Sequence, residues 1–422
     1  RSSDLMKNDM PLSICVLGRQ PALGLAELES LYGADAVSSV SSQAAGLRLE
    51  PAAINFARLG GSTKLANVIA TLPSPSWKLI EKELVRIARA TTSDSGLQAT
   101  ESGKFNIGIS ALGLDVTPAK LTALGLTLKK ILRTETRSVR IVPNQTAELS
   151  SAQVYHNHLT DERGAEILLI AARDGTTVIA RTVAVQDIDG YTLRDRGRPK
   201  RDARVGMLPP KLAQIIINLA VASAKPEHDS VILDPFCGTG VVLIEATMMG
   251  FDVYGTDIDP RMIQYTDTNL MWALDIPGTP VIRPVEASSD DNWRYFKIET
   301  GDATSHEWKP APNFVACETY LGRPFTTVPS RDVLEQTVSD VNLILKKFLV
   351  NIHDQLPPGA RLCLAVPAWQ TAPHRFRHLP LIDSLRELGY ERVALQRVRA
   401  DALLYYRDDQ IVARELVVLT RA

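Results

Sequence analysis

The chain has 422 residues, of which 45% are hydrophobic and 23% charged, so we expect two or three globular domains with enough apolar side chains to build their cores. No stretch approaches the roughly 18 consecutive apolar residues of a membrane helix, which argues against a membrane partner and favours a cytoplasmic protein. The four cysteines, at positions 15, 237, 317 and 363, lack metal-ligand spacing, so we expect free thiols and no metal site. The formal net charge of −1 means that a nucleic-acid partner would need a local basic patch.

Residues 1–75 and 76–187 predict two small modules that mix helices and strands. Leucines at three-residue spacing indicate a short helix in the first module, and Pro73 and Pro75 mark its end. We find no catalytic constellation in this first module. In the second module, helices and strands alternate too irregularly for a parallel nucleotide-binding sheet, so we expect an α+β fold.

Basic residues gather in the second module and in a predicted basic linker at 188–207. Between positions 194 and 204, six basic side chains stand against two acids, and glycine and proline argue against a long helix. A flexible basic segment is suited to tracking a phosphate backbone, although a solvated helix face or a solubilising linker would show the same charges. The candidate RNA-binding residues are Lys129, Lys130, Arg133, Arg194, Arg196, Arg198, Lys200 and Arg201.

Residues 231–246 predict the first strand, turn and helix of a sheet that binds a nucleotide-like ligand. An apolar run reaches Asp234, a glycine-rich turn follows, and a helical pattern starts after Gly240. Glycines let the backbone turn sharply beside a ligand, and the new helix offers unpaired N–H groups there. The candidate cofactor-binding residues of this stretch are Asp234, Pro235, Phe236, Cys237, Gly238, Thr239 and Gly240.

The next predicted strand ends in Asp257, followed by Ile258 and Asp259. An acid about twenty residues after the glycines is placed to accept hydrogen bonds from ribose hydroxyls. Asp259 is suited to capping the next helix or to supporting the ribose. The glycine turn is neither Gly-x-Gly-x-x-Gly nor a phosphate loop with Gly-Lys-Ser/Thr, so the ligand is not specified by those motifs.

The acid–Pro–Phe–Cys–Gly–x–Gly run at 234–240 resembles motif I of the class I S-adenosylmethionine-dependent methyltransferases, in the branch that methylates exocyclic amines of nucleic acids. Residues 128–142 and 149–159 resemble a THUMP domain, and the preceding module is similar to the ferredoxin-like domain that accompanies THUMP. Essentially the whole chain therefore resembles the THUMP-containing tRNA guanosine N2-methyltransferases.

This resemblance implies an α/β chain whose residues 208–422 form a Rossmann-like methyltransferase domain that uses S-adenosylmethionine. Its sheet would be mostly parallel with a C-terminal antiparallel strand. The N-terminal ferredoxin-like and THUMP domains would grip tRNA and present a distant nucleotide. Asp302, next to Ala303, is implied to accept a hydrogen bond from the adenine amino group. Whether a small activating protein assists the enzyme stays open.

The strand at 313–322 occupies the place of motif IV but departs from the Asp/Asn-Pro-Pro-aromatic pattern of amino-methyltransferases. Glu318 stands at the acid, Thr319 and Tyr320 replace the prolines, and Leu321 stands where the aromatic residue belongs. A carboxylate there accepts hydrogens from the exocyclic amine, and an aromatic ring stacks on the flipped base. We therefore expect Glu318, Tyr320 and Leu321 to form the catalytic end of the site, with Tyr320 as the stacking ring.

Three other functions remain open from the residues alone. An RNA-binding protein with a retained cofactor pocket would tolerate the altered motif IV. A methyltransferase acting on a DNA amino group would share motif I. A pyrimidine C5 methyltransferase would need a thiolate nucleophile, and Cys317 stands directly before Glu318.

Overall fold

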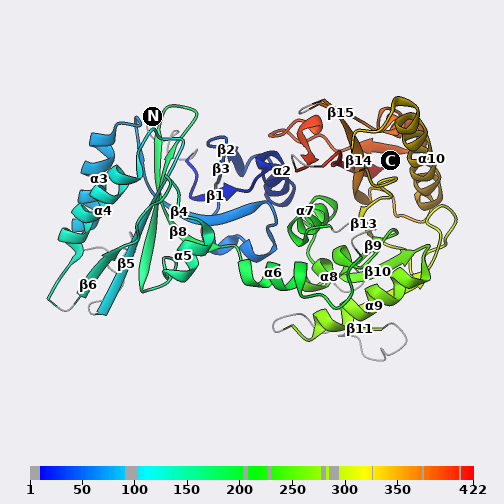
Figure 1. Ribbon diagram of the computed structural model, residues 1–422, viewed down its shortest axis with the longest axis horizontal. Helices are drawn as coiled ribbons and strands as arrows, with labels where there is room; N and C mark the ends of the chain where they lie inside the picture. The colour runs from blue at the N-terminus through cyan, green and yellow to red at the C-terminus, as the bar shows by residue number, and fades with distance from the viewer. Residues whose placement is uncertain are drawn as a thin grey trace. The chain divides into compact units, whose positions relative to one another are not determined.

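The computed structural model of the chain describes residues 10–90, 103–135, 137–202, 208–226, 230–276, 282–284, 294–325, 327–372, 375–407 and 410–422. They fall into two compact units (Figure 1). The N-terminal unit holds the chain up to residue 25, 33–57 and 61–188, and the C-terminal unit holds 26–32, 58–60 and 189–422. Among the described helices, none is both long and apolar enough to span a bilayer.

Within the described residues, one eight-stranded sheet runs through the N-terminal unit in the order β2-β3-β1-β4-β8-β7-β5-β6. Its strands are β1 (Ser13–Leu17), β2 (Val37–Ser39), β3 (Ala44–Leu47), β4 (Ser62–Leu72), β5 (Gly103–Leu112), β6 (Arg137–Ile141), β7 (Gly164–Ala171) and β8 (Thr177–Val185). The helices are α2 (Pro21–Tyr32, which continues into the C-terminal unit), α3 (Trp77–Arg89), α4 (Pro118–Leu132) and α5 (Ser151–His156), with 3-10 turns at Pro51–Ala53 and Phe56–Arg58. The two predicted modules thus share one sheet, and their domain boundaries and the THUMP assignment stay predictions.

Helices α3 and α4 cover one face of this sheet (Figure 1). Their inward stripes, including Ile80, Leu84 and Leu128, pack on alternate residues of the central strands such as Ile107 and Ile167. This matches the 3.6-residue period of a helix to the two-residue period of a strand. Burying these apolar stripes against the sheet stabilises both helices.

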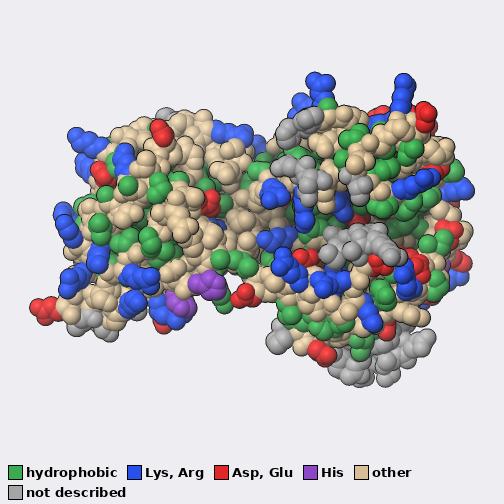
Figure 2. Space-filling view, in the orientation of Figure 1, with side chains coloured by type: hydrophobic (Ala, Val, Ile, Leu, Met, Phe, Trp, Pro, Cys, Tyr) green, Lys and Arg blue, Asp and Glu red, His purple; other side chains and the backbone are tan. Residues whose placement is uncertain are grey.

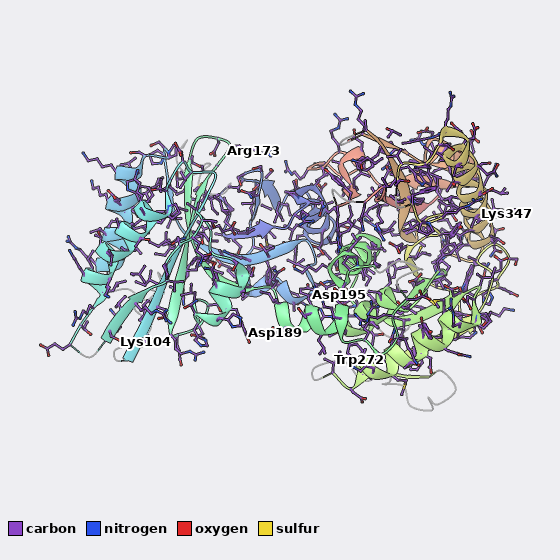
Figure 3. The ribbon with its side chains drawn as sticks, viewed as in Figure 1. Lys104, Arg173, Asp189, Asp195, Trp272 and Lys347 are labelled. Carbon is purple, nitrogen blue, oxygen red and sulfur yellow. The ribbon has the colours of Figure 1, made fainter. Side chains whose placement is uncertain are left out.

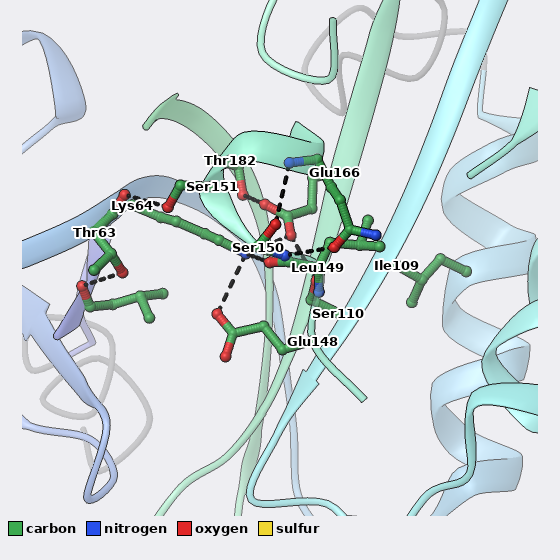
Figure 4. Close-up of polar contacts among 12 residues, drawn as sticks. Thr63, Lys64, Ile109, Ser110, Glu148, Leu149, Ser150, Ser151, Glu166 and Thr182 are labelled. Atoms are coloured by element: carbon green, nitrogen blue, oxygen red, sulfur yellow. Dashed lines mark hydrogen bonds and ion pairs between the residues drawn. The ribbon is translucent and has the colours of Figure 1, made fainter. Parts of the chain in front are cut away.

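A buried ion pair lies between the central strands of the N-terminal unit (Figure 4). The Nζ atom of Lys64 on β4 lies 2.7 Å from Oε1 of Glu166 on β7. Glu166 also accepts hydrogen bonds from Ser110 and Thr182, each at 2.6 Å, and Lys64 donates to the Leu149 carbonyl at 2.6 Å. Because each charge is paired and hydrogen-bonded, the desolvation cost of burying it is largely offset.

The predicted linker contains a helix, α6 (Ile188–Arg196), on which Figure 3 labels Asp189 and Asp195. Of the segment 194–204 that the sequence predicts to be flexible, residues 194–196 are therefore helical. Gly197 and Pro199 follow the last helical residue, so they end the helix instead of preventing it. The linker residues 203–207 lie outside the described residues.

The C-terminal unit contains, within the described residues, a sheet whose main path is β11-β12-β10-β9-β13-β14-β18-β16. Its strands are β9 (Val231–Asp234), β10 (Asp252–Asp257), β11 (Ile282–Pro284), β12 (Arg294–Thr300), β13 (Phe314–Glu318), β14 (Arg361–Ala372), β15 (Arg375–Arg377), β16 (Tyr390–Arg392), β17 (Leu404–Tyr405) and β18 (Val412–Arg421). The helices are α7 (Pro210–Val221), α8 (Val241–Met248), α9 (Pro260–Leu274) and α10 (Arg331–His353), with 3-10 segments at Pro380–Leu388 and Ala400–Ala402.

The six neighbouring strands β11, β12, β10, β9, β13 and β14 pair in parallel, whereas β18 pairs antiparallel with β14. This confirms the prediction of a mostly parallel sheet with a C-terminal antiparallel strand. The stripe of α10 that includes Val341, Leu345 and Phe348 packs into a core with the inner residues of β13, β14 and β18. The buried β9 and β13 runs lack polar alternation because a doubly covered parallel sheet hides both faces.

Candidate active site

The candidate site lies where the order of the parallel strands reverses. Strand β9 has β10 on one side and β13 on the other. The chain therefore adds β10 to β12 on one side of β9 and then crosses to the other side to add β13 and β14. Ligands bind at the carboxyl ends of strands at such a switch point. Three acids end these strands: Asp257 on β10, Asp234 on β9 and Glu318 on β13.

The glycine-rich loop after β9 folds into the tight turn that its sequence predicts. Gly238 and Gly240 both have positive φ, at 52° and 82°. The Gly240 amide donates to the Cys237 carbonyl at 2.7 Å, and the Cys237 amide donates to Thr256 on β10 at 3.0 Å. A Cβ atom at position 240 would lie 2.9 Å from the Thr266 side chain, so the loop requires glycine there both for its backbone angle and for close packing.

Two side chains of α9 hold the carbonyls of this loop, and sequence reasoning missed both. Thr266 donates to the Gly238 carbonyl at 2.8 Å, and Asn269 donates to the Thr239 carbonyl at 2.8 Å. Both residues are fully buried. Their three-residue spacing, which places them on one helix face, was the available signal. The amides of Cys237, Gly238 and Gly240 are also hydrogen-bonded, to Thr256, Asp257 and Cys237, so the backbone of the loop is fixed from both sides.

Asp257 links the glycine-rich loop after β9 to the start of α9 through hydrogen bonds to its carboxylate. Its carboxylate accepts from the Gly238 amide and from the Asp259 amide, both at 2.9 Å. Burial raises the pKa of Asp257 above its usual value, against these hydrogen bonds. Asp259 caps α9 by accepting from Arg261 at 2.9 Å, which is the capping role expected for it. Ile258 is 69% exposed, so its apolar side chain is available to a flat ligand.

The carboxyl ends of the three strands form an acidic environment. Asp234 is buried and accepts from the Phe236 amide at 3.1 Å. Burial raises its pKa well above the usual value, and the neighbouring charges of Asp257 and Glu318 add to this increase. Like charges at close quarters in a poorly solvated site repel each other. The site therefore favours a ligand that brings positive charge.

The remaining candidate residues around the cofactor site differ in burial. Asp302 is exposed and accepts from the backbone and side chain of Thr304 at 2.9 and 2.8 Å, bonds that lower its pKa. Ala303 is buried in the core, and the Phe236 ring packs edge-on against Phe348 with centroids 5.3 Å apart. The side chains of Ala303 and Phe236 thus have structural contacts, and the Ala303 carbonyl accepts a hydrogen bond from Asn351 at 3.1 Å.

Glu318 at the end of β13 has a partner that the sequence did not suggest. Arg414 on β18 donates from Nε to Glu318 Oε1 at 2.7 Å. The two residues are 96 positions apart, and only the strand order β13-β14-β18 brings them together. Their side chains are 16% and 8% exposed, respectively.

The residues after Glu318 explain how the altered motif IV is accommodated. Thr319 is buried and donates from both its backbone amide and its hydroxyl to the Ala365 carbonyl, at 3.1 and 3.3 Å. Proline has no amide hydrogen, so it could not make the first of these bonds. Tyr320 is 45% exposed, whereas Leu321 is half-buried. Of the two, Tyr320 is the side chain available for stacking.

Cys317 does not suit the nucleophile of a C5 methyltransferase. Its side chain is fully buried within the main core of the C-terminal unit. Burial raises the pKa of its thiol well above the usual value, and the charge of Asp234 adds to this increase. A covalent route needs an accessible thiolate, so the alternative that used Cys317 is overturned.

The structure corrects part of the predicted RNA-binding set. Arg194 is buried and paired with Glu245 at 2.7 Å. Arg198 is 3% exposed and donates to Thr239 at 3.4 Å, and burial lowers its pKa. Neither guanidinium lies on the surface, so neither is placed to track a phosphate backbone. Both arginines instead make polar contacts within the C-terminal unit, Arg194 with Glu245 and Arg198 with Thr239.

The other predicted RNA-binding residues are accessible. Lys130, Arg133, Arg196, Lys200 and Arg201 are exposed, and Lys129 is half-buried. Figure 2 shows Lys and Arg side chains on the visible faces of both units. Lys129 and Lys130 lie in the last turn of α4, where positive charge also favours the helix dipole. Their contact with RNA stays a prediction.

Comparison with known proteins points to the same chemistry. Residues 198–274 match the family described as RMKL-like, methyltransferase domain. This chain carries a methyltransferase domain. The solved structure of TrmN from Thermus thermophilus is similar over 97% of this chain and 99% of its own, with a TM-score of 0.50 and 16% identity, which shows a shared fold.

Two curated relatives of this chain are similar to it over part of their length. One is the tRNA (guanine(10)-N2)-dimethyltransferase of Methanothermobacter thermautotrophicus, 51% identical over 185 residues, 43% of this chain and 44% of the relative. The other has the same name in Methanocaldococcus jannaschii and is 34% identical over 104 residues, 25% of this chain and 28% of the relative. The matches thus span less than half of either relative.

The cofactor of the methyltransferase domain is S-adenosylmethionine, as the sequence predicted. The chemistry of the site fits this group, because its sulfonium and ammonium are cations and the strand ends are acidic. Asp257 would hold the ribose, and the exposed Ile258 would contact the adenine face. The backbone of the glycine loop, where Gly238 and Gly240 have no side chains, would lie against the methionine part. These assignments to individual residues are expectations that binding measurements can test.

Proposed function

We propose that this protein is a tRNA methyltransferase that transfers a methyl group from S-adenosylmethionine to the exocyclic N2 of a guanosine. The observation that carries the proposal is the placement of Glu318 beside the cofactor loop, at the end of the strand next to β9. The curated relatives, which carry the name of tRNA guanine-N2 methylation, support the choice of substrate.

The proposed reaction needs an activated amine and a correctly placed base. The lone pair of an exocyclic amine is delocalised into the ring, so the amine is a weak nucleophile. Glu318 accepts an amine hydrogen, which directs the nitrogen lone pair toward the methyl carbon, and Tyr320 stacks on the flipped base. When bound, S-adenosylmethionine supplies an electrophilic methyl group on a sulfonium that leaves as a neutral thioether.

The proton balance of the transfer falls to the same carboxylate. The N2 nitrogen bonds to the methyl carbon as the carbon–sulfur bond breaks, and sulfur keeps the bonding electrons. The nitrogen then loses one proton, which Glu318 receives through the oxygen that faced it and passes to solvent. No covalent intermediate is needed, which agrees with the burial of Cys317.

In this proposal the N-terminal unit binds tRNA and acts as the predicted ferredoxin-like and THUMP modules. The accessible basic residues Lys130, Arg133, Arg196, Lys200 and Arg201 contribute electrostatic attraction to phosphates. A tRNA substrate, together with four cysteines that are buried as thiols, supports a cytoplasmic location.

Nucleoside mass spectrometry tests the proposal. Unmodified total tRNA is incubated with protein and isotopically labelled S-adenosylmethionine, then digested and analysed. We expect labelled N2-methylguanosine, with guanosine 10 as the first position to map because the relatives' names give it. Labelled methyl groups only on adenine, cytosine or DNA would contradict the proposal.

The rival function is RNA binding with lost catalysis. Glu318→Gln keeps the shape of the side chain but removes the carboxylate, so we expect turnover to fall roughly 100-fold while tRNA affinity is unchanged. If the unaltered protein binds both cofactor and tRNA but forms no methylated nucleoside, the binding function is the correct one.

A further inference from the structure

The pairing of Glu318 with Arg414 suggests how the site selects its base, if the proposed function holds. Glu318 Oε1 accepts from Arg414 Nε at 2.7 Å, and among the described residues this is the one ion pair that Glu318 forms. Its side chain retains 16% exposure. One carboxylate oxygen is therefore anchored to the protein, and the second is left for a ligand.

Arg414 reaches Glu318 from two strands away. It stands opposite Pro367 on β14, while Glu318 stands beside Ala365 on the same strand, so the arginine side chain crosses β14 to make the contact. Arg414 is only 8% exposed, and burial limits the conformations that it can adopt. A buried, charge-assisted bond of this length fixes the direction of the carboxylate.

The electrostatic surroundings give Arg414 a second task. Asp234 interacts with Glu318 as a like charge, which disfavours a carboxylate at this strand end. The guanidinium of Arg414 offsets that repulsion because it lies directly against Glu318. The glutamate is one methylene longer than the usual aspartate, and anchoring it removes the extra freedom that the longer side chain brings.

We propose that Arg414 is a positioning residue and that the Arg414–Glu318 pair restricts the target to a base whose amine lies beside a ring N–H, as in guanine. A carboxylate has only acceptors. Guanine offers it two donors, N1–H and the N2 amine. Adenine and cytosine place a ring nitrogen lone pair beside their amine, and this lone pair repels a fixed carboxylate.

Kinetics of Arg414 variants test the positioning role. We expect Arg414→Gln to lower kcat about 100-fold, as misplacement by about 1 Å does, with KM for tRNA and Kd for S-adenosylmethionine changed less than about twofold. Arg414→Lys keeps the charge but not the position of Nε, so its loss of kcat should be intermediate. Unchanged kcat in Arg414→Gln overturns the positioning role.

Arg392→Gln is the matched control for lost stability. Arg392 pairs with Glu415, the neighbour of Arg414 on β18, at 3.1 Å. The control removes an ion pair from the same terminal strands without touching Glu318. We expect both variants to lower the melting temperature but only Arg414→Gln to lower kcat. Equal losses of kcat would mean that Arg414 is merely structural.

Base analogues test the specificity without altering the protein. A tRNA carrying 2-aminopurine at the mapped position retains the 2-amine but replaces N1–H with a lone pair. We expect its methylation to be at least about 100-fold slower, because a site built for an N–H rejects an analogue without it. Equal rates overturn the base selection. A protein inactive on every tRNA overturns the proposed function and this inference together, whereas an active protein insensitive to both changes overturns the inference alone.

Discussion

Each unit buries charged side chains, but the two sets are arranged differently. In the N-terminal unit, Lys64 is paired with the buried Glu166 at 2.7 Å and with the partly exposed Glu148 at 3.3 Å, and hydroxyl and carbonyl groups complete the hydrogen bonds of the buried pair. In the C-terminal unit, Asp234 and Asp257 carry the same charge and burial raises the pKa of both, whereas Glu318 beside them is paired with Arg414.

The difference shows how to recognise a functional group of charges. A balanced and fully hydrogen-bonded pair stabilises one conformation and leaves nothing for a ligand. A set of like charges at strand ends costs folding free energy unless something of opposite charge binds. The second arrangement is therefore the one expected at a site for a cationic cofactor.

The largest effect that we expect comes from breaking the balanced pair. Lys64→Met should leave Glu166 buried without a cation and lower the free energy of unfolding of the N-terminal unit by about 3–5 kcal/mol. Urea denaturation measures this. The double variant Lys64→Met/Glu166→Leu should recover much of the loss. If the single variant loses less than about 1 kcal/mol, the pair is not the structural centre of this unit.

A smaller but more specific effect is expected at Gly240. Gly240→Ala forces a Cβ atom against Thr266 at a φ of 82°, and left-handed strain alone costs about 1–2 kcal/mol. Calorimetry should show S-adenosylmethionine affinity reduced about 10- to 100-fold. Gly175→Ala is the matched control, because Gly175 has a φ of 84° with nothing within 4 Å. The control should lose stability only; equal losses of affinity in both variants would contradict a direct role of the loop.

Asp257→Asn should weaken cofactor binding roughly tenfold. The two oxygens of the Asp257 carboxylate accept from the backbone amides of Gly238 and Asp259. The asparagine side chain has one oxygen, so it can accept from only one of these backbone amides and directs its own N–H group at the other. An unsatisfied donor costs about 1–3 kcal/mol. Asp302→Asn, at an exposed acid of the same sheet edge, should have a smaller effect. If Asp302→Asn weakened S-adenosylmethionine binding more than Asp257→Asn does, Asp257 would not be the residue that holds the ribose.

The mildest effect is the pH dependence of binding. The pKa values of Asp234 and Asp257 are raised in the folded protein, so their contribution to stability falls as pH rises from the unfolded-state pKa through the folded-state pKa. Ionisation in this range creates the charge that attracts a sulfonium. S-adenosylmethionine affinity should therefore rise with pH there, by at most about tenfold per unit for each group.

S-adenosylhomocysteine provides the comparison for this pH effect because it lacks the sulfonium charge. Its affinity should change less over the same pH range, as isothermal titrations of both ligands would show. Parallel pH curves for the two ligands would mean that the acidic strand ends do not sense the sulfonium.

The sequence by itself determined the local features of this protein. The glycines at 238 and 240 required a tight turn, Asp257 followed from its distance to that turn, and the leucines at three-residue spacing in the first module predicted the short helix α2. Each of these depends on residues close together in the chain, where the backbone period and turn geometry leave few alternatives.

Only the tertiary structure decided which distant residues meet. Arg414 reaches Glu318 because β14 and β18 pair in one register, and Arg194 and Arg198 are buried although a basic linker is usually solvated. No local pattern encodes such contacts, since strand order and burial depend on the packing of the whole unit. Charge in a sequence therefore predicts a partner of opposite sign, and the fold determines whether that partner is a side chain or a ligand.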